Sequence, residues 1–236
     1  MKAVILAAGL GTRLRPITDS VPKCMVPVNG TPIIDKQINN LIENGISESD
    51  IIIIGGYLED VLKSHLQTKY PRINFISNPR FNETNNMYSL YLAKEFVEGK
   101  EFLLMNADVY FDSDIIKGLL KAPGSAIACD QSQYLEESMK ITVDASGAIT
   151  HISKKISEAD HFAVSIDVYK ISPEASRELF KTIRQTIIEE KNENSWTEVA
   201  LDSIFETQQF RPYVIDGRWF EIDTLEDLKR AEDIFS

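Results

Sequence analysis

The chain has 236 residues, of which 43% are hydrophobic and 26% are charged, a composition typical of globular proteins and unlike that of disordered chains. Lys and Arg number 25 and Asp and Glu number 36, so the formal net charge is −11. No run of basic residues interrupts this acidic balance. The composition argues against a protein that coats nucleic acid, and we expect no nucleic-acid partner.

The first apolar run, residues 3–12, is about half as long as a membrane-spanning helix. No small-residue cleavage pattern follows it, so we expect neither a membrane segment nor a secretory signal. The two cysteines, Cys24 and Cys129, and the three scattered histidines exclude a disulfide framework and a zinc site. We therefore expect a cytoplasmic protein with no membrane partner, and the sequence leaves open whether it is a monomer or a homo-oligomer.

The first half of the chain alternates between two kinds of segment. Short apolar runs bounded by Gly, Pro or Asn are typical of strands buried on both faces, and they occur at residues 3–8, 51–54, 73–77 and 102–107. Segments with helical spacing of apolar residues lie between them, at 34–42, 58–62 and 86–97. This alternation predicts an α/β fold with a Rossmann-like, mixed but mostly parallel sheet flanked by helices.

After about residue 122 the pattern becomes richer in short strands. A hairpin with a Ser146-Gly147 turn is predicted over residues 141–152, followed by a strand at 163–170. Helices are predicted over 173–190 and 199–207, and short strands over 213–215 and 219–222. A last helix begins at Thr224, whose spacing to Asp227 predicts a capping box.

The most informative segment is residues 3–25, in which a Gly-rich loop follows the first strand directly. Open α/β sheets bind ligands at this edge. Gly9 and Gly11 let backbone N–H groups approach a phosphate, and Thr12 adds a hydroxyl. Residues 1–30 hold four basic side chains against one acid, which predicts a polyanionic ligand. Three of these cations follow the glycines: Arg13, Arg15 and Lys23.

Two other phosphate-binding loops do not fit this segment. A Walker A loop ends in Gly-Lys-Ser/Thr, which is missing here, and a dinucleotide fingerprint has a third glycine where this chain has Leu14. A nicotinamide-dependent oxidoreductase is disfavoured for that reason, and also because it would leave Asp108 and Asp223 without a role.

Several motifs resemble those of a known family. The residues Leu6-Ala7-Ala8-Gly9, Gly11-Thr12-Arg13-Leu14 and Pro22-Lys23 resemble the signature of the nucleotidyltransferases that make NDP-sugars and CDP-alcohols. The segments Asn85-Asn86-Met87-Tyr88-Ser89 and Trp219-Phe220-Glu221-Ile222-Asp223 are similar to those of the phosphocholine-type cytidylyltransferases. The resemblance covers nearly the whole chain. It implies one nucleotidyltransferase domain over 1–236, with a nucleotide-binding half (1–122) and a half (123–236) that carries a small β-rich acceptor-binding insertion and metal-site residues.

The resemblance implies Mg²⁺-dependent transfer of a cytidylyl group from CTP to a small phosphorylated metabolite, with release of pyrophosphate. Phosphocholine is the first choice of acceptor. The alternatives are aminoethylphosphonate, inositol phosphate, a phosphorylated amino-acid amide or a sugar-1-phosphate. A non-catalytic regulatory protein of the same fold is the most distant alternative.

The resemblance also assigns roles to individual residues. Arg13 is expected to hold the β- and γ-phosphates, and Lys23 the α-phosphate or the acceptor phosphate, so these two are the expected catalytic residues. The expected Mg²⁺ ligands are Asp108 and Asp223, because Mg²⁺ prefers carboxylates, phosphate oxygens and water. The expected nucleotide-binding residues are Leu6, Ala7, Ala8, Gly9, Gly11, Thr12, Arg13, Lys23, Asn85, Asn86 and Ser89. The expected acceptor-binding residues are Lys140, Lys154, Trp196, Glu198 and Glu221, and Glu221 is also a candidate accessory metal ligand.

Two of these roles have alternatives. Adjacent amides at Asn85 and Asn86 can read the carbonyl and amino groups of cytosine; the alternative is that Asn85 only caps the helix that begins there, and the two roles are compatible, one for each Asn. Aromatic residues near the expected cavity mouth either form a cage for a quaternary ammonium or belong to the core. These residues are Tyr110, Tyr134, Phe162, Trp196 and Trp219.

Overall fold

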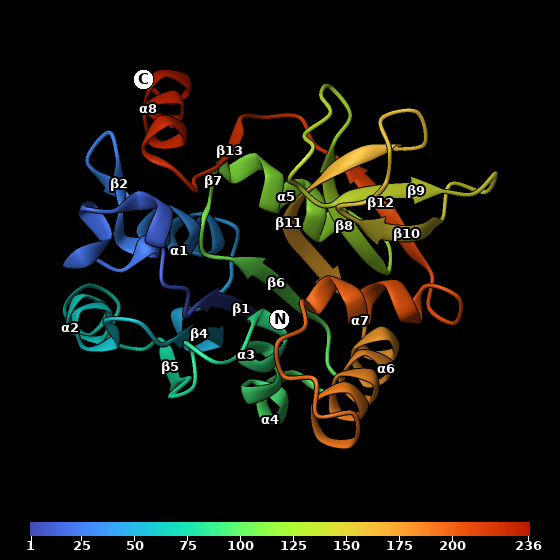
Figure 1. The fold of residues 1–236 in the computed structure, drawn as a ribbon, viewed down its shortest axis with the longest axis horizontal. Coiled ribbons are helices and arrows are strands. Elements are labelled where there is room, and N and C mark those ends of the chain that lie inside the picture. The colour runs from blue at the N-terminus through green and yellow to red at the C-terminus, as the bar shows by residue number, and fades with distance from the viewer.

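The computed structural model describes residues 1–236, which form a nine-stranded sheet covered by helices on both faces (Figure 1). Its centre is the parallel set that the apolar runs predict. Strand β1 (Lys2–Ala7) lies between β6 (Phe102–Asn106) and β4 (Ile51–Gly55), and β5 (Asn74–Ser77) pairs with β4. The carboxyl ends of these strands therefore meet at one edge of the sheet.

Strands from the second half extend this sheet beyond β6. The long strand β11 (Ala163–Ile171) runs antiparallel to β6 and also pairs with β8 and β9. The remaining strands of this region are β8 (Ser125–Asp130), β9 (Lys140–Val143), β10 (Ile149–Ser153) and β12 (Phe210–Val214). The predicted hairpin is confirmed as the antiparallel pair β9–β10. The result is a mixed sheet with a parallel core, as predicted.

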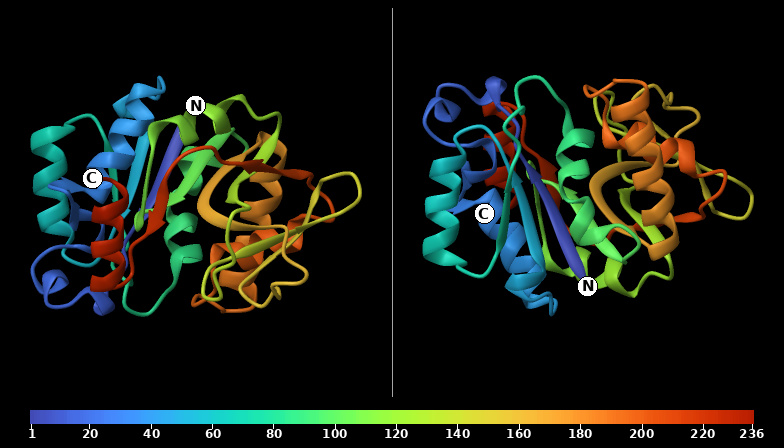
Figure 2. Two further views of the ribbon diagram at one scale, coloured as in Figure 1. Left: turned by 90° about the horizontal axis from the view of Figure 1, so that it is seen from above. Right: turned by 90° about the horizontal axis from the view of Figure 1, so that it is seen from below.

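Alternate residues of β1 enter the two layers of core. Val4 and Leu6 pack in one apolar cluster with helices α3 (Asn86–Leu92), α4 (Lys94–Val97), α6 (Pro173–Arg184) and α7 (Thr197–Ile204). Ala3, Ile5 and Ala7 pack in another, with α1 (Ile33–Glu43), α2 (Glu59–Lys69) and α5 (Ser113–Lys121). Figure 2 shows the sheet between these two helical layers. Burial on both faces explains why the central strands have continuous apolar sequences.

A smaller apolar cluster fixes the C-terminal helix α8 (Leu225–Ile234) against the hairpin of β2 (Pro27–Val28) and β3 (Thr31–Pro32). The predicted capping box at the start of α8 is confirmed, because the side chains of Thr224 and Asp227 each accept a backbone N–H of the other. Because Ile222 belongs to this cluster, the cluster also fixes the segment that directly precedes α8.

The structure corrects several expected element boundaries. The helix expected over 86–97 is interrupted at Ala93, which separates α3 from α4. Leu58 precedes α2 in a left-handed conformation, and Val61 is exposed, so these two residues do not share a buried helical face with Leu62. The α-helix expected over 173–190 changes to a π-helical turn after Arg184.

No helix of this fold combines the length and the apolar character that crossing a bilayer would require. Cys24 and Cys129 are both buried and unpaired, in agreement with the exclusion of a disulfide framework.

Candidate active site

The Gly-rich loop leaves the carboxyl end of β1 and is fixed by buried contacts. Gly11 adopts a left-handed conformation (φ 62°), and a short 3-10 turn follows over Thr12–Leu14. The buried Thr18 hydroxyl donates a 2.7 Å hydrogen bond to the Gly11 carbonyl, and Tyr57 donates a 2.9 Å bond to the Thr18 carbonyl. These contacts fix the shape of the loop, whose residues 9–12 line a cavity.

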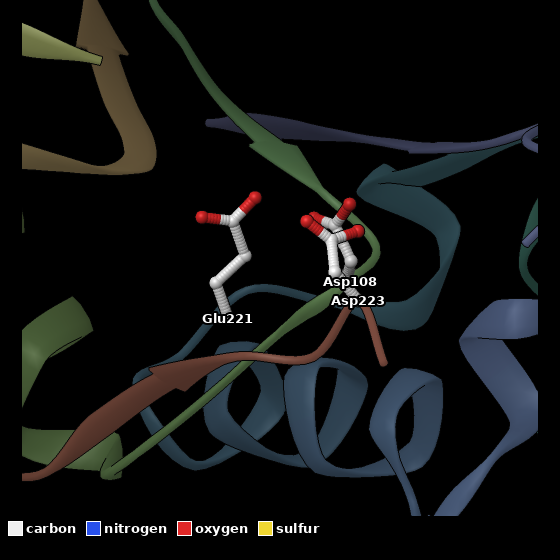
Figure 3. Close-up of side chains that lie close together, drawn as sticks. All are labelled: Asp108, Glu221 and Asp223. Carbon is white, nitrogen blue, oxygen red and sulfur yellow. The ribbon is translucent and has the colours of Figure 1, made fainter. Parts of the chain in front are cut away.

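Three carboxylates from distant parts of the sequence meet next to this loop. Asp108 follows β6, and Glu221 and Asp223 lie at the end of β13 (Trp219–Glu221). Antiparallel pairing of β13 with β7 (Val109–Phe111), and a 2.9 Å bond from the Ile222 N–H to the Asp108 carbonyl, bring the two segments together. One oxygen of each carboxylate lies within 4.8 Å of the others (Figure 3).

This acidic cluster has the chemistry of a divalent-cation site. Mg²⁺ and similar hard cations prefer carboxylate oxygens, and a carboxylate has enough lone pairs to accept from a cationic side chain and to bind a metal as well. The Oδ1 atom of Asp108 is available to such a cation, because it is buried and has no hydrogen-bond partner. The carboxylates of Asp108, Glu221 and Asp223 could therefore hold a metal ion at the sheet edge.

Two cations balance these acids. The Lys23 ammonium lies 2.7 Å from Asp108 Oδ2 and 2.6 Å from Asp223 Oδ1, and Arg13 Nη2 lies 2.8 Å from Asp223 Oδ2. Burial raises the pKa of Asp223, but the charges of Lys23 and Arg13 outweigh burial and leave the pKa below its usual range. Glu221 lacks such a partner, so burial and the neighbouring carboxylates raise its pKa well above the usual range.

Two adjoining cavities, of about 350 and 300 Å³, open around these charges. The smaller one is formed by the Gly-rich loop, and Arg13 and Lys23 line both. Nearly all of the sequence-predicted site residues lie on their walls. The smaller cavity is lined by Leu6, Ala7, Gly9, Gly11, Thr12, Arg13, Lys23, Asp108 and Asp223. The larger cavity is lined by Ala8, Asn85, Asn86, Ser89, Lys154, Trp196, Glu198 and Glu221, together with several residues that also line the smaller cavity.

The two adjacent asparagines have different surroundings. Asn85 caps α3 through its side-chain oxygen, which accepts the Asn86 N–H at 2.8 Å, and its amide nitrogen has no protein partner. The Asn86 side chain bridges to α7 instead: its oxygen accepts the Thr197 N–H at 2.8 Å, and its nitrogen lies 3.4 Å from Glu198 Oε2. Asn85 therefore combines a capping role with a free donor in the cavity, whereas Asn86 joins two helix starts.

The loop before α3 is fastened to the segment before α7. Arg80 forms a two-pronged ion pair with Glu193, with N–O distances of 2.8 and 2.6 Å. The Glu193 carbonyl also accepts the Asn85 N–H at 3.2 Å. Two parallel bonds between a guanidinium and a carboxylate fix orientation as well as distance. This contact joins two walls of the larger cavity.

The structure does not support an acceptor-binding role for Lys140. Its side chain is completely buried, and its ammonium donates to the carbonyls of Glu136 and Leu135 at 2.7 and 3.4 Å. Met139, the preceding residue, lines the larger cavity. Because successive side chains of a strand point to opposite faces, Lys140 points away from the cavity that Met139 reaches.

The aromatic residues expected near the cavity mouth are also mostly elsewhere. Of that group only Trp196 lines either of these two cavities. Tyr110 packs against Phe235, Tyr134 against His161, and the Trp219 indole N–H donates to Asp130 at 2.8 Å. Phe162 packs against the core cluster that contains Val4 and Leu6. No aromatic cage is formed.

Sequence reasoning missed several residues that line the larger cavity. Asn106 lies at the carboxyl end of β6, two residues before Asp108, so the strand-end argument that identified Asp108 could have identified it. Asp167 lies in the middle of β11 and carries no signal in the sequence pattern. The full set of missed residues is Asn78, Phe81, Thr84, Asn106, Ser138, Met139 and Asp167.

Comparison with known proteins identifies relatives of the same architecture. The chain is 34% identical over 254 aligned residues to the CTP:phosphoglutamine cytidylyltransferase of Campylobacter jejuni, with 97% of this chain and 98% of that protein covered. It is 46% identical over 117 residues to the choline-phosphate cytidylyltransferase of Streptococcus pneumoniae, covering 50% of this chain and 48% of that protein. The solved structure of the CTP:phosphocholine cytidylyltransferase of Streptococcus pneumoniae superposes with a TM-score of 0.81 at 27% identity, over 100% of this chain and 99% of that one. The nucleotidyl transferase family model matches residues 2–232, and the chain belongs to that family.

Proposed function

We propose that this protein transfers the cytidylyl group of CTP to a small phosphorylated acceptor and releases pyrophosphate. The observation that carries the proposal is the meeting of Arg13, Lys23 and the acidic cluster between two adjoining cavities. The smaller cavity, lined by the Gly-rich loop, suits a triphosphate. The larger has room for a base and an acceptor. The names of the relatives support CTP as the nucleotide and a phosphorylated small molecule as the acceptor.

The proposed reaction is an attack by an acceptor phosphate oxygen on the α-phosphorus of CTP. The new bond joins that oxygen to the α-phosphorus, and the bond from the α-phosphorus to the bridging oxygen of pyrophosphate breaks. An acceptor phosphate is already an adequate nucleophile, so positioning and charge neutralisation suffice for catalysis. This agrees with the side chains on the cavity walls, which include no Ser–His or Cys–His pair.

Each charged group has a part in this scheme. Arg13 would hold the β- and γ-phosphates and stabilise the departing pyrophosphate. Lys23 uses two of its three N–H donors on Asp108 and Asp223, which leaves one for the phosphates that react. Asp108 and Asp223, with Glu221 beside them, would hold Mg²⁺. When bound, Mg²⁺ would neutralise charge on the triphosphate.

The choice of base can be tested with the four ribonucleoside triphosphates and dTTP, by following pyrophosphate release with a panel of acceptors. We expect CTP to be preferred, because the two N–H groups of the free Asn85 amide can donate to the carbonyl and to ring nitrogen N3 of cytosine, whereas N3 of uracil and thymine carries a hydrogen. Asn85→Ala should reduce that preference and also weaken the start of α3, whereas Asn85→Ser keeps a capping group and isolates the loss of the amide. A preference of the wild type for UTP or dTTP would contradict the cytidylyl assignment.

The conformation of Gly11 makes a separate prediction. A Cβ atom at Gly11 would lie 2.9 Å from Lys23 Cβ, and the residue has a φ of +62°. We expect Gly11→Ala to displace Lys23 and to lower kcat/KM for CTP by about tenfold or more. Gly30→Ala is a matched control, because Gly30 has a φ of +83° and nothing within 4 Å of its Cβ position. Equal activity of the two variants would contradict the proposed placement of Lys23.

A further inference from the structure

Asp167 reaches the larger cavity through a local distortion of β11. The residue has a φ of +57°, and the pairing of β11 with β8 changes register between Ser165 and Tyr169. A left-handed conformation is unfavourable for most residues with a side chain, whereas glycine adopts it readily. Bulges of this kind redirect side chains next to functional sites. Here the carboxylate of Asp167 faces the same cavity as Glu198.

The two carboxylates share one phenol. The Tyr169 hydroxyl lies 2.8 Å from Asp167 Oδ1 and 3.0 Å from Glu198 Oε1, and Tyr169 and Glu198 are almost completely buried. A phenol has one hydrogen, so it can donate to only one of the two carboxylates at a time. The other side-chain donors are also neutral: the amides of Asn106, at 3.0 Å from Asp167, and of Asn86, at 3.4 Å from Glu198, and the Ser165 hydroxyl, at 3.5 Å from Asp167.

No cation of the protein forms an ion pair with Asp167 or Glu198: the Lys154 ammonium, which lies over the Trp196 ring, acts on Glu198 only from beyond ion-pair distance. Every hydrogen-bond donor that a side chain supplies to Asp167 and Glu198 is a neutral amide or hydroxyl. Burying a carboxylate without a cation is costly. Burial, and next the charge of Glu198, raise the pKa of Asp167 to about 7. Burial also raises the pKa of Glu198, so the free protein disfavours two negative charges at this end of the cavity, and a cation brought in by a ligand would stabilise the fully charged pair.

The surroundings indicate what kind of cation fits. A quaternary ammonium has no N–H groups and is recognised best by several aromatic faces. The cavity has two aromatic residues: Phe81 packs against Tyr57 on the nucleotide side, and Trp196 already has the Lys154 ammonium 5.1 Å from its ring centre. A primary ammonium, in contrast, has three N–H donors that can be shared between two carboxylates.

We propose that Asp167, together with Glu198, is a specificity-determining residue that selects acceptors carrying a primary ammonium group. This inference rests on the proposed cytidylyl transfer and narrows its acceptor class. It predicts that acceptors with an unmethylated amine bind more tightly than phosphocholine. The acceptor's nitrogen would bind between Asp167 and Glu198, while its phosphate faces Lys23 and the acidic cluster.

Binding of three matched compounds to the protein tests this directly. Phosphoethanolamine carries a primary ammonium, phosphocholine the trimethylated form, and n-propyl phosphate a methyl group in place of the nitrogen. Their dissociation constants are measured by calorimetry with Mg²⁺ and a CTP analogue in which a methylene group replaces the α,β-bridging oxygen. We expect phosphoethanolamine to bind about tenfold or more tightly than either of the other two.

Two variants separate recognition from structure. Asp167→Asn keeps the size of the side chain but removes its charge, and Asp167→Gly removes the side chain while suiting the positive φ. Both should weaken phosphoethanolamine binding by about tenfold or more and leave the binding of n-propyl phosphate and the CTP analogue within about twofold. Glu206→Gln, on the exposed surface beyond α7, is the control and should change none of these values.

Equal binding of the three compounds, no detectable binding of any of them, or unchanged phosphoethanolamine binding in both variants would overturn the inference. These outcomes are distinct from failure of the proposed function. That failure would appear as no release of pyrophosphate from CTP with any acceptor, including amino-acid and sugar phosphates.

Discussion

Replacing Lys23 by Ala should lower turnover by about 10²–10⁴-fold, because its partly buried ammonium contacts both Asp108 and Asp223. The loss should appear mainly in kcat if Lys23 acts on the phosphates as the new bond forms. Pyrophosphate release with CTP and a working acceptor measures it. Lys121→Ala, at the exposed end of α5, is the control for removing a lysine.

The same substitution should change how stability depends on pH. Lys23 and Arg13 hold the pKa of Asp223 in the folded protein below its usual range. Ionised Asp223 therefore stabilises the fold fully at pH values above the ordinary pKa that an Asp has in the unfolded chain. That contribution disappears as the pH falls through the lowered pKa. We therefore expect the Tm difference between the wild type and Lys23→Ala to be largest near neutral pH and smaller in acid.

Near-normal turnover of a folded Lys23→Ala protein would refute the catalytic role assigned to this residue.

Replacing Asp108 by Asn should abolish most metal-dependent turnover, with an expected loss of about 10²–10³-fold or more. The Oδ1 atom of Asp108 is buried without a hydrogen-bond partner, which suits a metal ligand. Because a ligand that binds only the folded state stabilises it, Mg²⁺ should raise the Tm of the wild type in the presence of CTP. The shift should be much smaller for Asp108→Asn.

Asp114→Asn is the matched control for this experiment, since Asp114 is exposed on α5 and forms a surface ion pair with Lys117. It should preserve both turnover and the Mg²⁺-dependent rise in Tm. An Asp108→Asn variant with the full Mg²⁺ response would show that the metal binds elsewhere.

The sequence predicted the parts of the fold that depend on local pattern. Continuous apolar runs identified β1, β4 and β6, since burial on both faces leaves no polar alternation, and β5 was also predicted although this edge strand is only partly buried. Asp108 and Asp223 could be placed in one site although they are far apart in the chain, because each belongs to a motif that resembles the same family. The pairing of β13 with β7 is the contact that brings them together.

The remaining features depend on register and on tertiary packing. Lys140 has a favourable position in the sequence, but the direction of its side chain is set by which face of β9 meets the cavity. Asp167 reaches the cavity only because β11 is distorted where it pairs with β8. A distortion of this kind leaves no periodic signal in the amino-acid sequence. The hydrogen bond that joins Asn86 to the start of α7 leaves none either.

The most direct test of the account follows the two ends of the triphosphate separately. CTP labelled either at the α-phosphorus or at the γ-phosphorus is incubated with Mg²⁺ and an acceptor, and the products are separated and identified by mass. Cytidylyl transfer predicts that the α-label enters a CDP-linked acceptor and that the γ-label leaves as pyrophosphate. Transfer of the γ-label to the acceptor, or appearance of the α-label only as CMP, would contradict it.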